Sequence, residues 1–347
     1  MLAPLNQAAH WNRLAGALNP AWSFTEVRAR VVRVVDEAPG VRSLWLKPNR
    51  RFGRFQPGQH VLLDLDIAGA RHKRCFSLSH APRADGLIRL TIKRKDEGRV
   101  SAAAHALTVG HVVRLGRAQG EFALRDTRGK LLLLAGGSGI TPMLSHLHAL
   151  ADAGSTRDVV LLQACRTPAD VLFADELRDL ATRLPQLQVL QHVTNEFGWL
   201  NATSLAARVP DWAGRETLMC GPDGFMATIT RTYSDAGLGD QLQSESFGLR
   251  APPIDPDAAA HAVAYGTTAF SARAGQTLLA AAEAAGLQPK FGCRRGICHT
   301  CQCRKRSGTV VNLLTGRTSG NGDELIQLCI STPQSAVELA PFAEETP

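Results

Sequence analysis

A group of closely spaced cysteines limits what this chain can fold into more than any other feature of the sequence. Cys293, Cys298 and Cys301 follow one another as C-x4-C-x2-C in "FGCRRGICHTCQCR", and Cys329 comes later in "IQLCIS". Four thiolates hold a plant-type [2Fe–2S] cluster with this spacing. Glycines in the loop let backbone N–H groups approach the sulfur atoms without a Cβ in the way. The four cysteines therefore predict a [2Fe–2S] cluster.

Two other metal centres compete with this interpretation. Structural zinc sites usually combine two short C-x2-C pairs, whereas here three cysteines are grouped and one stands alone. A Rieske centre would need cysteine–histidine pairs in two separate places, and only His299 in "CHTC" lies near a ligand. Cys303 is then expected to fill space in the interior, and His299 to lie on the surface.

The remaining residues must form more than one further domain. With 347 residues the chain exceeds the roughly 250–300 at which a single hydrophobic core stops growing. No apolar run approaches the roughly 20 residues of a membrane-spanning helix, and residues 1–25 lack the features of a signal peptide. We therefore expect a cytoplasmic protein with reduced thiols. The net charge is +8 without a basic block, so we expect no nucleic-acid partner.

An apolar stripe marks the predicted N-terminal extension, residues 1–25. Trp11, Leu14, Leu18 and Trp22 recur at helical spacings of three and four. Such a stripe could lie on a membrane or dock a partner, which would place the protein at the inner membrane face. Because most such stripes pack on the protein's own core, we expect core packing here.

Residues 128–248 show the pattern of a parallel α/β sheet, with apolar strands at 131–135, 159–164, 187–193 and 217–220. Helical stretches separate these strands. In such sheets ligands bind beyond the carboxyl ends of the strands.

The first of these strands runs into the glycine-rich turn "GGSGIT". Thr141 is predicted to cap the following helix, and Pro142 to occupy its first position. A strand, a glycine turn and a helix N-terminus together suit a pyrophosphate. Arg166, after the second strand, stands where an acidic side chain would hold the ribose diol of NADH. A positive charge better suits a 2′-phosphate, so we expect NADPH, with NADH as the alternative.

Residues 26–127 contain short alternating segments divided by glycine turns, which predicts an antiparallel β-barrel. Within it lie "RCFSLS" and "GRVS". An arginine beside hydroxyl groups can hold a phosphate while the backbone faces a flat ring. Residues 249–259 are rich in proline and predict a linker. Residues 260–347 begin with a strand, a turn and a helix that ends at Gly286, before the cysteine loop.

In this order the motifs resemble the ferredoxin–NADP⁺ reductase superfamily, in the form that is fused to a C-terminal plant-type ferredoxin domain. The resemblance covers roughly residues 26–340. It implies an antiparallel β-barrel flavin domain, an α/β nucleotide domain with a parallel sheet, and an α+β ferredoxin domain of the β-grasp type. "RCFS" matches the flavin motif R-x-Y/F-S. This match implies that Arg74 meets a flavin phosphate, that Phe76 lies against the ring system, and that Ser77 lies near flavin N5.

The other motifs imply further contacts by resemblance. "TIKR" and "GRVS" correspond to flavin segments, "GGSGITP" to the pyridine-nucleotide phosphate loop, "CGP" to the segment beside the nicotinamide, and "ESF" to the family's terminal aromatic motif. The positions are, for the flavin, Lys93, Gly98, Val100, Ser101 and Phe247; for the phosphates, Gly136, Gly137, Ser138, Gly139 and Thr141; for the nicotinamide, Cys220, Gly221 and Pro222. Ser77, Cys220 and Glu245 are the predicted catalytic residues. The resemblance implies that Ser77 and Cys220 position the two rings and that Glu245 lies close to the flavin ring.

Among fused forms the chain most resembles the reductase partners of bacterial membrane fatty-acyl desaturases and alkane hydroxylases, which use FAD and NADPH. The resemblance implies electron flow from NADPH to FAD, to [2Fe–2S] and to a separate acceptor protein. The alternative is an NADH-dependent reductase, with FMN or FAD, for a soluble oxygenase. Asn195 favours it, because many members of the family carry arginine there, and an arginine could help to bind the 2′-phosphate of NADPH. A redox sensor without turnover is a third hypothesis.

Overall fold

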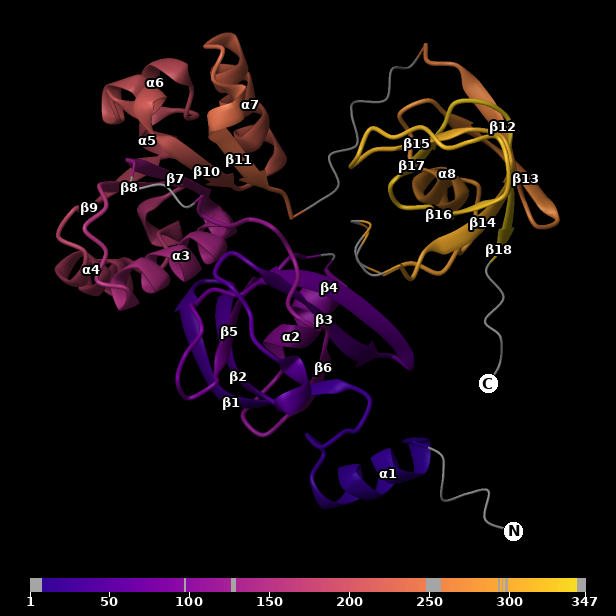
Figure 1. The fold of residues 1–347 in the computed structure, drawn as a ribbon, viewed down its shortest axis with the longest axis horizontal. Helices are drawn as coiled ribbons and strands as arrows, with labels where there is room; N and C mark the ends of the chain where they lie inside the picture. The colour runs from indigo at the N-terminus through magenta and orange to yellow at the C-terminus, as the bar shows by residue number, and fades with distance from the viewer. Residues whose placement is uncertain are drawn as a thin grey trace. The chain divides into compact units, whose positions relative to one another are not determined.

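The structure is a computed structural model that describes most of the chain in two compact units, Met1–Phe247 and Gly248–Pro347 (Figure 1). The described residues are 8–96, 98–125, 129–247, 257–292, 294, 296 and 299–341. No helix within these ranges is both long and apolar enough to cross a lipid bilayer.

The first unit begins with a barrel-like antiparallel sheet, as the sequence predicted. Its strands are β1 (Val27–Ala38), β2 (Val41–Pro48), β3 (His60–Ile67), β4 (Ala70–Ser77), β5 (Ile88–Lys93) and β6 (Val112–Leu115). They pair in the order β4-β3-β6-β1-β2-β5. An antiparallel bridge between Leu78 and Leu90 joins the two ends of this order and closes the barrel. The alternating side chains of β1 place Val27, Ala29 and Val31 inside, and each buried aliphatic side chain contributes about 1.5–3 kcal/mol.

The second part of this unit is a five-stranded parallel sheet between two layers of helices. Its strands are β7 (Leu131–Gly136), β8 (Val159–Cys165), β9 (Leu187–Val193), β10 (Glu216–Cys220) and β11 (Leu242–Glu245), and its longer helices are α3 (Ile140–Asp152), α4 (Ala174–Arg183), α6 (Ala202–Arg208) and α7 (Asp223–Asp235). The strand order is β11-β10-β7-β8-β9. The chain leaves the centre through β8 and returns through β10, so the order switches between β7 and β10. Ligands of α/β sheets bind at this switch.

One local prediction was wrong. Helix α3 begins at Ile140, after a short 3₁₀ turn over Gly137–Gly139, and its N-cap is Gly139. Thr141 therefore lies inside the first turn, where its hydroxyl donates to the carbonyl oxygen of Ser138 at 3.0 Å. The glycine-rich loop turns sharply enough to start the helix before the predicted cap.

The second unit is a mixed sheet that holds one helix, as expected for a β-grasp domain. Its strands β12 (Ala260–Tyr265), β13 (Thr268–Arg273), β14 (Gln302–Ser307), β16 (Glu324–Gln327) and β18 (Val337–Pro341) pair in the order β13-β12-β18-β14-β16. A separate pair consists of β15 (Val310–Asn312) and β17 (Ser331–Pro333). Helix α8 (Leu278–Ala284) is capped by the side chain of Thr277, and it buries Leu278 and Leu279 in the core of this unit.

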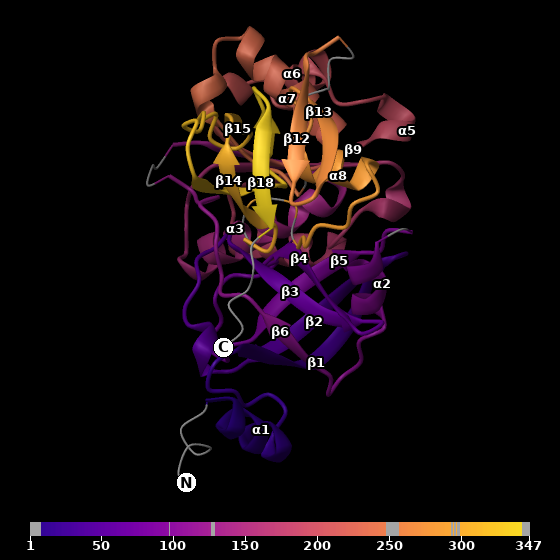
Figure 2. The ribbon, with the colours of Figure 1, turned by 90° about the vertical axis from the view of Figure 1, so that its right-hand side faces the viewer.

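The N-terminal stripe does not pack on the core, contrary to our expectation. It lies on helix α1 (Ala8–Leu18), beside the barrel end of the first unit (Figure 2). Trp11 and Leu18 are 47% and 80% exposed. The side chain of Asn12 instead forms hydrogen bonds with Ser23, Phe24 and Thr25, in the segment that leads into the barrel, and these bonds orient the helix. The predicted linker lies largely outside the described residues, and the predicted domain bounds stay predictions.

Candidate functional site

Three residues from separate sequence motifs meet where the barrel adjoins the parallel sheet. Glu245 is the last residue of β11, and its carboxylate is buried. Ser77, the last residue of β4, donates its hydroxyl to Oε2 of Glu245 at 3.2 Å. Cys220 ends β10 and is the register partner of Glu245 on the neighbouring strand. Ser77 thus contacts the buried Glu245 carboxylate, and Cys220 lies beside Glu245 on the adjacent strand.

A fourth residue of this group was missed by the sequence analysis. His60 opens β3 directly opposite Ser77, and its Nδ1 lies 3.1 Å from Oε1 of Glu245. The other ring nitrogen, Nε2, is buried and has no hydrogen-bond partner among the described residues. Leaving such an atom unsatisfied costs about 1–3 kcal/mol, so its partner is expected to come from a bound group. The only sequence signal was a histidine at a strand start.

The residues of the flavin motif continue along the same strand. Arg74 and Phe76 are half-buried on β4, and Phe76 also packs against the barrel core. Lys93 is exposed at the end of β5, and Phe247 is partly exposed just after β11. Arg74 and Phe76 thus share the strand whose last residue, Ser77, contacts the Glu245 carboxylate.

The "GRVS" segment forms a tight turn into helix α2 (Arg99–His105). Ser101 donates to the carbonyl oxygen of Gly98 at 2.9 Å and accepts from the backbone N–H of Lys95 at 3.1 Å. A Cβ on Gly98 would come within 2.4 Å of the Ser101 hydroxyl oxygen. Val100 is buried in the barrel core. The glycine is therefore required for this turn to close.

The two glycine-containing loops of the parallel sheet, residues 136–139 and 220–222, pack against each other where the strand order switches. A Cβ on Gly139 would meet the carbonyl oxygen of Cys220 at 2.0 Å, and one on Gly136 would meet Pro222 at 2.8 Å. Gly137 has a positive φ of 52°. The backbones of 136–139 and 220–222 can pack this closely only because side chains are absent. The Cys220 side chain itself is completely buried.

Arg166 follows β8 at the same carboxyl edge of the sheet. Its side chain is 71% exposed and lies 3.6 Å from the Asp170 carboxylate. The backbone carbonyl of Arg166 accepts from the N–H of Asn195, which places the loops after β8 and β9 side by side. The hydroxyl of Thr167 lowers the pKa of Asp170, and the positive charges of Arg166 and Lys93 add to this effect. Lys93 and Arg166, from barrel and sheet, thus act on one carboxylate.

Half of the predicted cluster ligands are described. Cys301 and Cys329 are buried in the second unit, whereas Cys293 and Cys298 lie outside the described residues. The backbone N–H of Gly296 donates to the Cys329 sulfur at 3.3 Å. A Cβ on Gly296, whose φ is +74°, would lie 2.7 Å from Ile330. N–H bonds to sulfur stabilise cluster thiolates, so this part of the loop fits an iron–sulfur cluster.

The other cysteines are buried or half-buried. Burial raises the pKa of Cys303 to about 12 and also raises the pKa of Cys165. Thiols of this kind stay protonated and pack as small apolar groups. Cys75 is half-buried on β4. For Cys303 this agrees with the expectation that it fills space in the interior.

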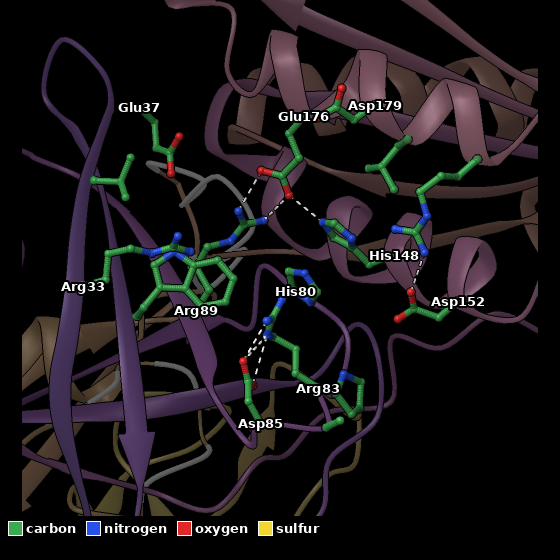
Figure 3. A pocket seen from close by; sticks show the side chains of 16 residues that line it. Arg33, Glu37, His80, Arg83, Asp85, Arg89, His148, Asp152, Glu176 and Asp179 are labelled. Atoms are coloured by element: carbon green, nitrogen blue, oxygen red, sulfur yellow. Dashed lines mark hydrogen bonds and ion pairs between the residues drawn. The ribbon is translucent and has the colours of Figure 1, made fainter.

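A cavity of the first unit lies elsewhere. About 950 Å³ in volume, it is lined by Arg89 of β5, His148 of α3 and Glu176 of α4, among others (Figure 3). None of the predicted site residues lines it. Arg89 binds Glu176 through two hydrogen bonds, and Glu176 also bonds His148. Paired groups of this kind join the barrel to the helices of the sheet.

Comparison with known proteins agrees with this division of the chain. Three family profiles match: the oxidoreductase FAD-binding domain over residues 37–124, the oxidoreductase NAD-binding domain over 133–231, and the 2Fe-2S iron-sulfur cluster binding domain over 264–334. The crystal structure of phthalate dioxygenase reductase has the same fold, with a TM-score of 0.60 and 23% identity, covering 91% of this chain and 97% of that one.

Two relatives from Mycobacterium tuberculosis are more similar in sequence. An NADPH oxidoreductase is 36% identical over 90% of this chain and 84% of its own length. The ferredoxin reductase component of 3-ketosteroid-9-alpha-monooxygenase is 33% identical over 88% of this chain and 93% of its own length. The chain therefore belongs to the ferredoxin-reductase family of NAD(P)H-dependent oxidoreductases, with an FAD-binding domain, an NAD-binding domain and a [2Fe–2S] domain.

Proposed function

We propose that this protein takes electrons from NADPH and delivers them, through FAD and a [2Fe–2S] cluster, to a separate oxygenase-type acceptor. When bound, the flavin accepts a hydride and gives up single electrons, which the cluster can carry. The observation that carries the proposal is the convergence on Glu245, which links Ser77 of the barrel to the strand of Cys220. One buried point thus joins the flavin motif to the nucleotide-binding sheet.

The residues around Glu245 can hold and move a proton. Its two carboxylate oxygens face different partners, Oε2 the hydroxyl of Ser77 and Oε1 the Nδ1 of His60. A carboxylate between two such groups can accept a proton on one oxygen while keeping a hydrogen bond on the other. We infer that Glu245 serves as this proton-holding group, that Ser77 and Cys220 fix the positions of the two rings, and that His60 orients Glu245.

The remaining predicted residues bind the cofactors. For the flavin we propose Arg74 and the turn of Gly98, Val100 and Ser101 at the phosphate, with Phe76, Lys93 and Phe247 at the ring system. For the nucleotide we propose Gly136, Gly137, Ser138, Gly139 and Thr141 at the pyrophosphate, and Gly221 and Pro222 at the nicotinamide. For the cluster we propose the sulfur atoms of Cys293, Cys298, Cys301 and Cys329.

NADPH is preferred to NADH because of Arg166. Its exposed guanidinium stands at the carboxyl edge of β8 and shares only a long contact with Asp170. A 2′-phosphate would be bound by this group, and Lys93 adds a second positive charge nearby. The name of the Mycobacterium tuberculosis NADPH oxidoreductase points the same way.

The acceptor class follows from the relatives. The named partners include 3-ketosteroid-9-alpha-monooxygenase and glycine betaine monooxygenase, whose reductase subunits this chain resembles over most of its length. We therefore propose an oxygen-activating acceptor in the cytoplasm. Within that class, a membrane-bound desaturase or hydroxylase at the inner membrane face is the more specific proposal, and a soluble oxygenase is the alternative.

Spectroscopy of the purified protein tests the redox chain. We expect flavin and iron–sulfur absorption bands, bleached by anaerobic NADPH, and catalytic reduction of ferricyanide by NADPH. Arg166→Ser is expected to raise the KM for NADPH about tenfold, because hydrogen bonds to charged groups contribute about 1.5–3 kcal/mol. The KM for NADH should not change.

The matched control is Arg178→Ser, since Arg178 is similarly exposed and pairs with an acid on its own helix. A protein that binds zinc in place of iron, or that shows no turnover with either nucleotide, would contradict the proposed function. Faster reduction by NADH, with no effect of Arg166→Ser, would instead support the NADH-dependent alternative.

A further inference from the structure

Helix α1 is fastened to the barrel by its polar side. Asn12 accepts a hydrogen bond from the backbone N–H of Phe24 at 2.6 Å and donates to the hydroxyl of Thr25 at 2.6 Å. Asn19, just after the helix, accepts from the guanidinium of Arg30 on β1 at 2.8 Å. Gly16 lies between them, and a Cβ there would be 3.5 Å from the Arg28 guanidinium. Spaced by four and three, residues 12, 16 and 19 share one helical face.

The opposite face of α1 carries the apolar stripe. Trp11, Leu14 and Leu18 are spaced by three and four, and each is exposed by nearly half or more. An amphipathic helix of a globular protein normally turns such a stripe toward the core. Here the polar anchors hold the helix the other way round, so the stripe is presented to the outside.

Neighbouring segments enlarge this exposed surface. Trp22 and Phe24 follow the helix and are 53% and 59% exposed. Val109 is 64% exposed and precedes Gly110. Arg30 donates hydrogen bonds to the carbonyl oxygen of Gly110 and to the side chain of Asn19, which brings the turn of Val109 near the end of the helix. We call the following residues the apolar surface: Trp11, Leu14, Leu18, Trp22, Phe24 and Val109. A contiguous exposed apolar patch usually marks an interaction site.

A group of arginines adjoins the apolar surface. Four exposed arginines line an open cavity of about 580 Å³; this arginine group consists of Arg50, Arg51, Arg54 and Arg117. Within the described ranges, none of the four forms an ion pair with a carboxylate. Asn49, the residue before Arg50, donates its side-chain amide to the carbonyl oxygens of Ala21 and Glu26. These two hydrogen bonds hold the loop that begins at Arg50 against the segment that carries Trp22.

We propose that this end of the barrel binds the surface of an anionic phospholipid bilayer. Leucine side chains of α1 would enter the acyl boundary, the two tryptophans would lie at the headgroup level, and the arginine group would contact lipid phosphates. A bilayer fits better than an acidic protein because the aromatic and aliphatic side chains lie in line along a helix, with free positive charges beside it. The proposal does not depend on the electron path.

Vesicle sedimentation with the full chain, loaded with its cofactors, tests this proposal. We expect binding to vesicles that contain phosphatidylglycerol and little binding to pure phosphatidylcholine. Arg50→Ser combined with Arg51→Ser should weaken binding about fivefold for each arginine removed. Leu18→Ser combined with Trp22→Ser should weaken it at least about tenfold. All variants should keep the ferricyanide reductase activity of the unchanged protein, which shows that they are folded.

Matched controls come from the parallel-sheet part of the same unit. Trp199→Ser removes a tryptophan that is 74% exposed, and Arg231→Ser removes an exposed arginine of α7, and neither should change binding. Equal sedimentation with both kinds of vesicle, or none with either, would overturn the proposal. So would a dimer in light scattering that Leu18→Ser and Trp22→Ser convert to a monomer without any lipid binding, because the apolar surface would then contact a second copy.

Discussion

Two carboxylates join the barrel to the parallel-sheet part of the first unit, Glu245 buried and Glu176 partly buried, and they differ in how fully they are paired. Glu176 of α4 accepts two hydrogen bonds from Arg89 of β5, at 2.7 and 2.8 Å, and contacts His148 of α3 at 2.5 Å. Glu245 of β11 accepts one hydrogen bond from Ser77 and contacts His60. Both carboxylates cross the same junction, at different places.

The difference lies in what their partners still lack. The Arg89 guanidinium also donates to the backbone and hydroxyl of Ser79, and the His148 ring stacks on His80 with centroids 3.7 Å apart (Figure 3). At the other junction, Nε2 of His60 is buried without a partner among the described residues. A network whose hydrogen-bonding groups are all paired stabilises a fold, whereas a buried group without a partner is available to bind a ligand. We therefore expect mutations at the first to lower stability and mutations at the second to lower turnover.

The largest effect is expected from breaking the saturated network. Arg89→Met leaves the Glu176 carboxylate without its main partner. Because that carboxylate is 25% exposed, the loss should approach but not reach the roughly 3–5 kcal/mol that removing one member of a fully buried ion pair costs. The temperature at which flavin is released should fall by several degrees, while the initial rate at low temperature stays near that of the unchanged protein. Arg83→Met is the control, because its partner Asp85 is largely exposed and such pairs contribute about 1 kcal/mol or less. Equal effects of both variants would refute the distinction.

Acid should weaken the same network. Burial lowers the pKa of His80 from 6.5 to about 4, and the neighbouring His148, Arg89 and Arg83 add to the effect. The unfolded chain therefore takes up a proton that the folded chain refuses, so stability falls as the pH drops from about 6.5 to about 4, by up to about 3 kcal/mol. His80→Phe, which keeps a flat ring, should make the urea midpoint less dependent on pH between 7 and 5. At pH 8 the urea midpoints of the two proteins should differ little. A pH dependence of the urea midpoint that is the same in both proteins would contradict this prediction.

Glu176 adds a second, more acidic window. Burial raises the pKa of Glu176, but hydrogen bonds from His148 and Arg89 outweigh burial and lower the pKa to about 2. A depressed carboxyl pKa contributes stability that is complete above about pH 4.5 and is lost as the pH falls toward 2. The pH ranges over which His80 and Glu176 affect stability overlap only near pH 4. The loss of stability measured between pH 7 and 5 therefore comes from histidine.

The two junctions also show what a sequence can reveal. Ser77 and Glu245 were predicted because each belongs to a short motif, and the parallel strands because their apolar runs are continuous. His60 was missed, since only the register of β3 with β4 brings it to Ser77. The pair of Arg89 with Glu176 leaves no local pattern, because the two residues come from different parts of the fold. The predicted orientation of α1 was wrong because hydrogen bonds from its polar side, and not the spacing of its apolar residues, determine how the helix lies.

A smaller effect in free energy should have the clearest kinetic signature. Glu245→Gln keeps the size of the side chain and both hydrogen-bonding positions. It removes the carboxyl group, which can accept and release a proton, whereas an amide cannot. We expect acceptor reduction by NADPH to slow about a hundredfold, as for a lost general acid or base, which equals about 2.7 kcal/mol of activation free energy. The temperature of flavin release should change little.

His60→Phe completes this test because it removes the residue that faces Glu245 while keeping a ring. If His60 acts by orienting Glu245, His60→Phe should slow the unchanged protein about tenfold but have little further effect in Glu245→Gln, since residues that work through one another are not additive. The absorption maximum of the bound flavin should shift in His60→Phe, because the buried Nε2 would no longer face the bound group. Additive losses with no spectral shift would show that the His60–Glu245 contact is structural, and the comparison between the two carboxylates would then fail.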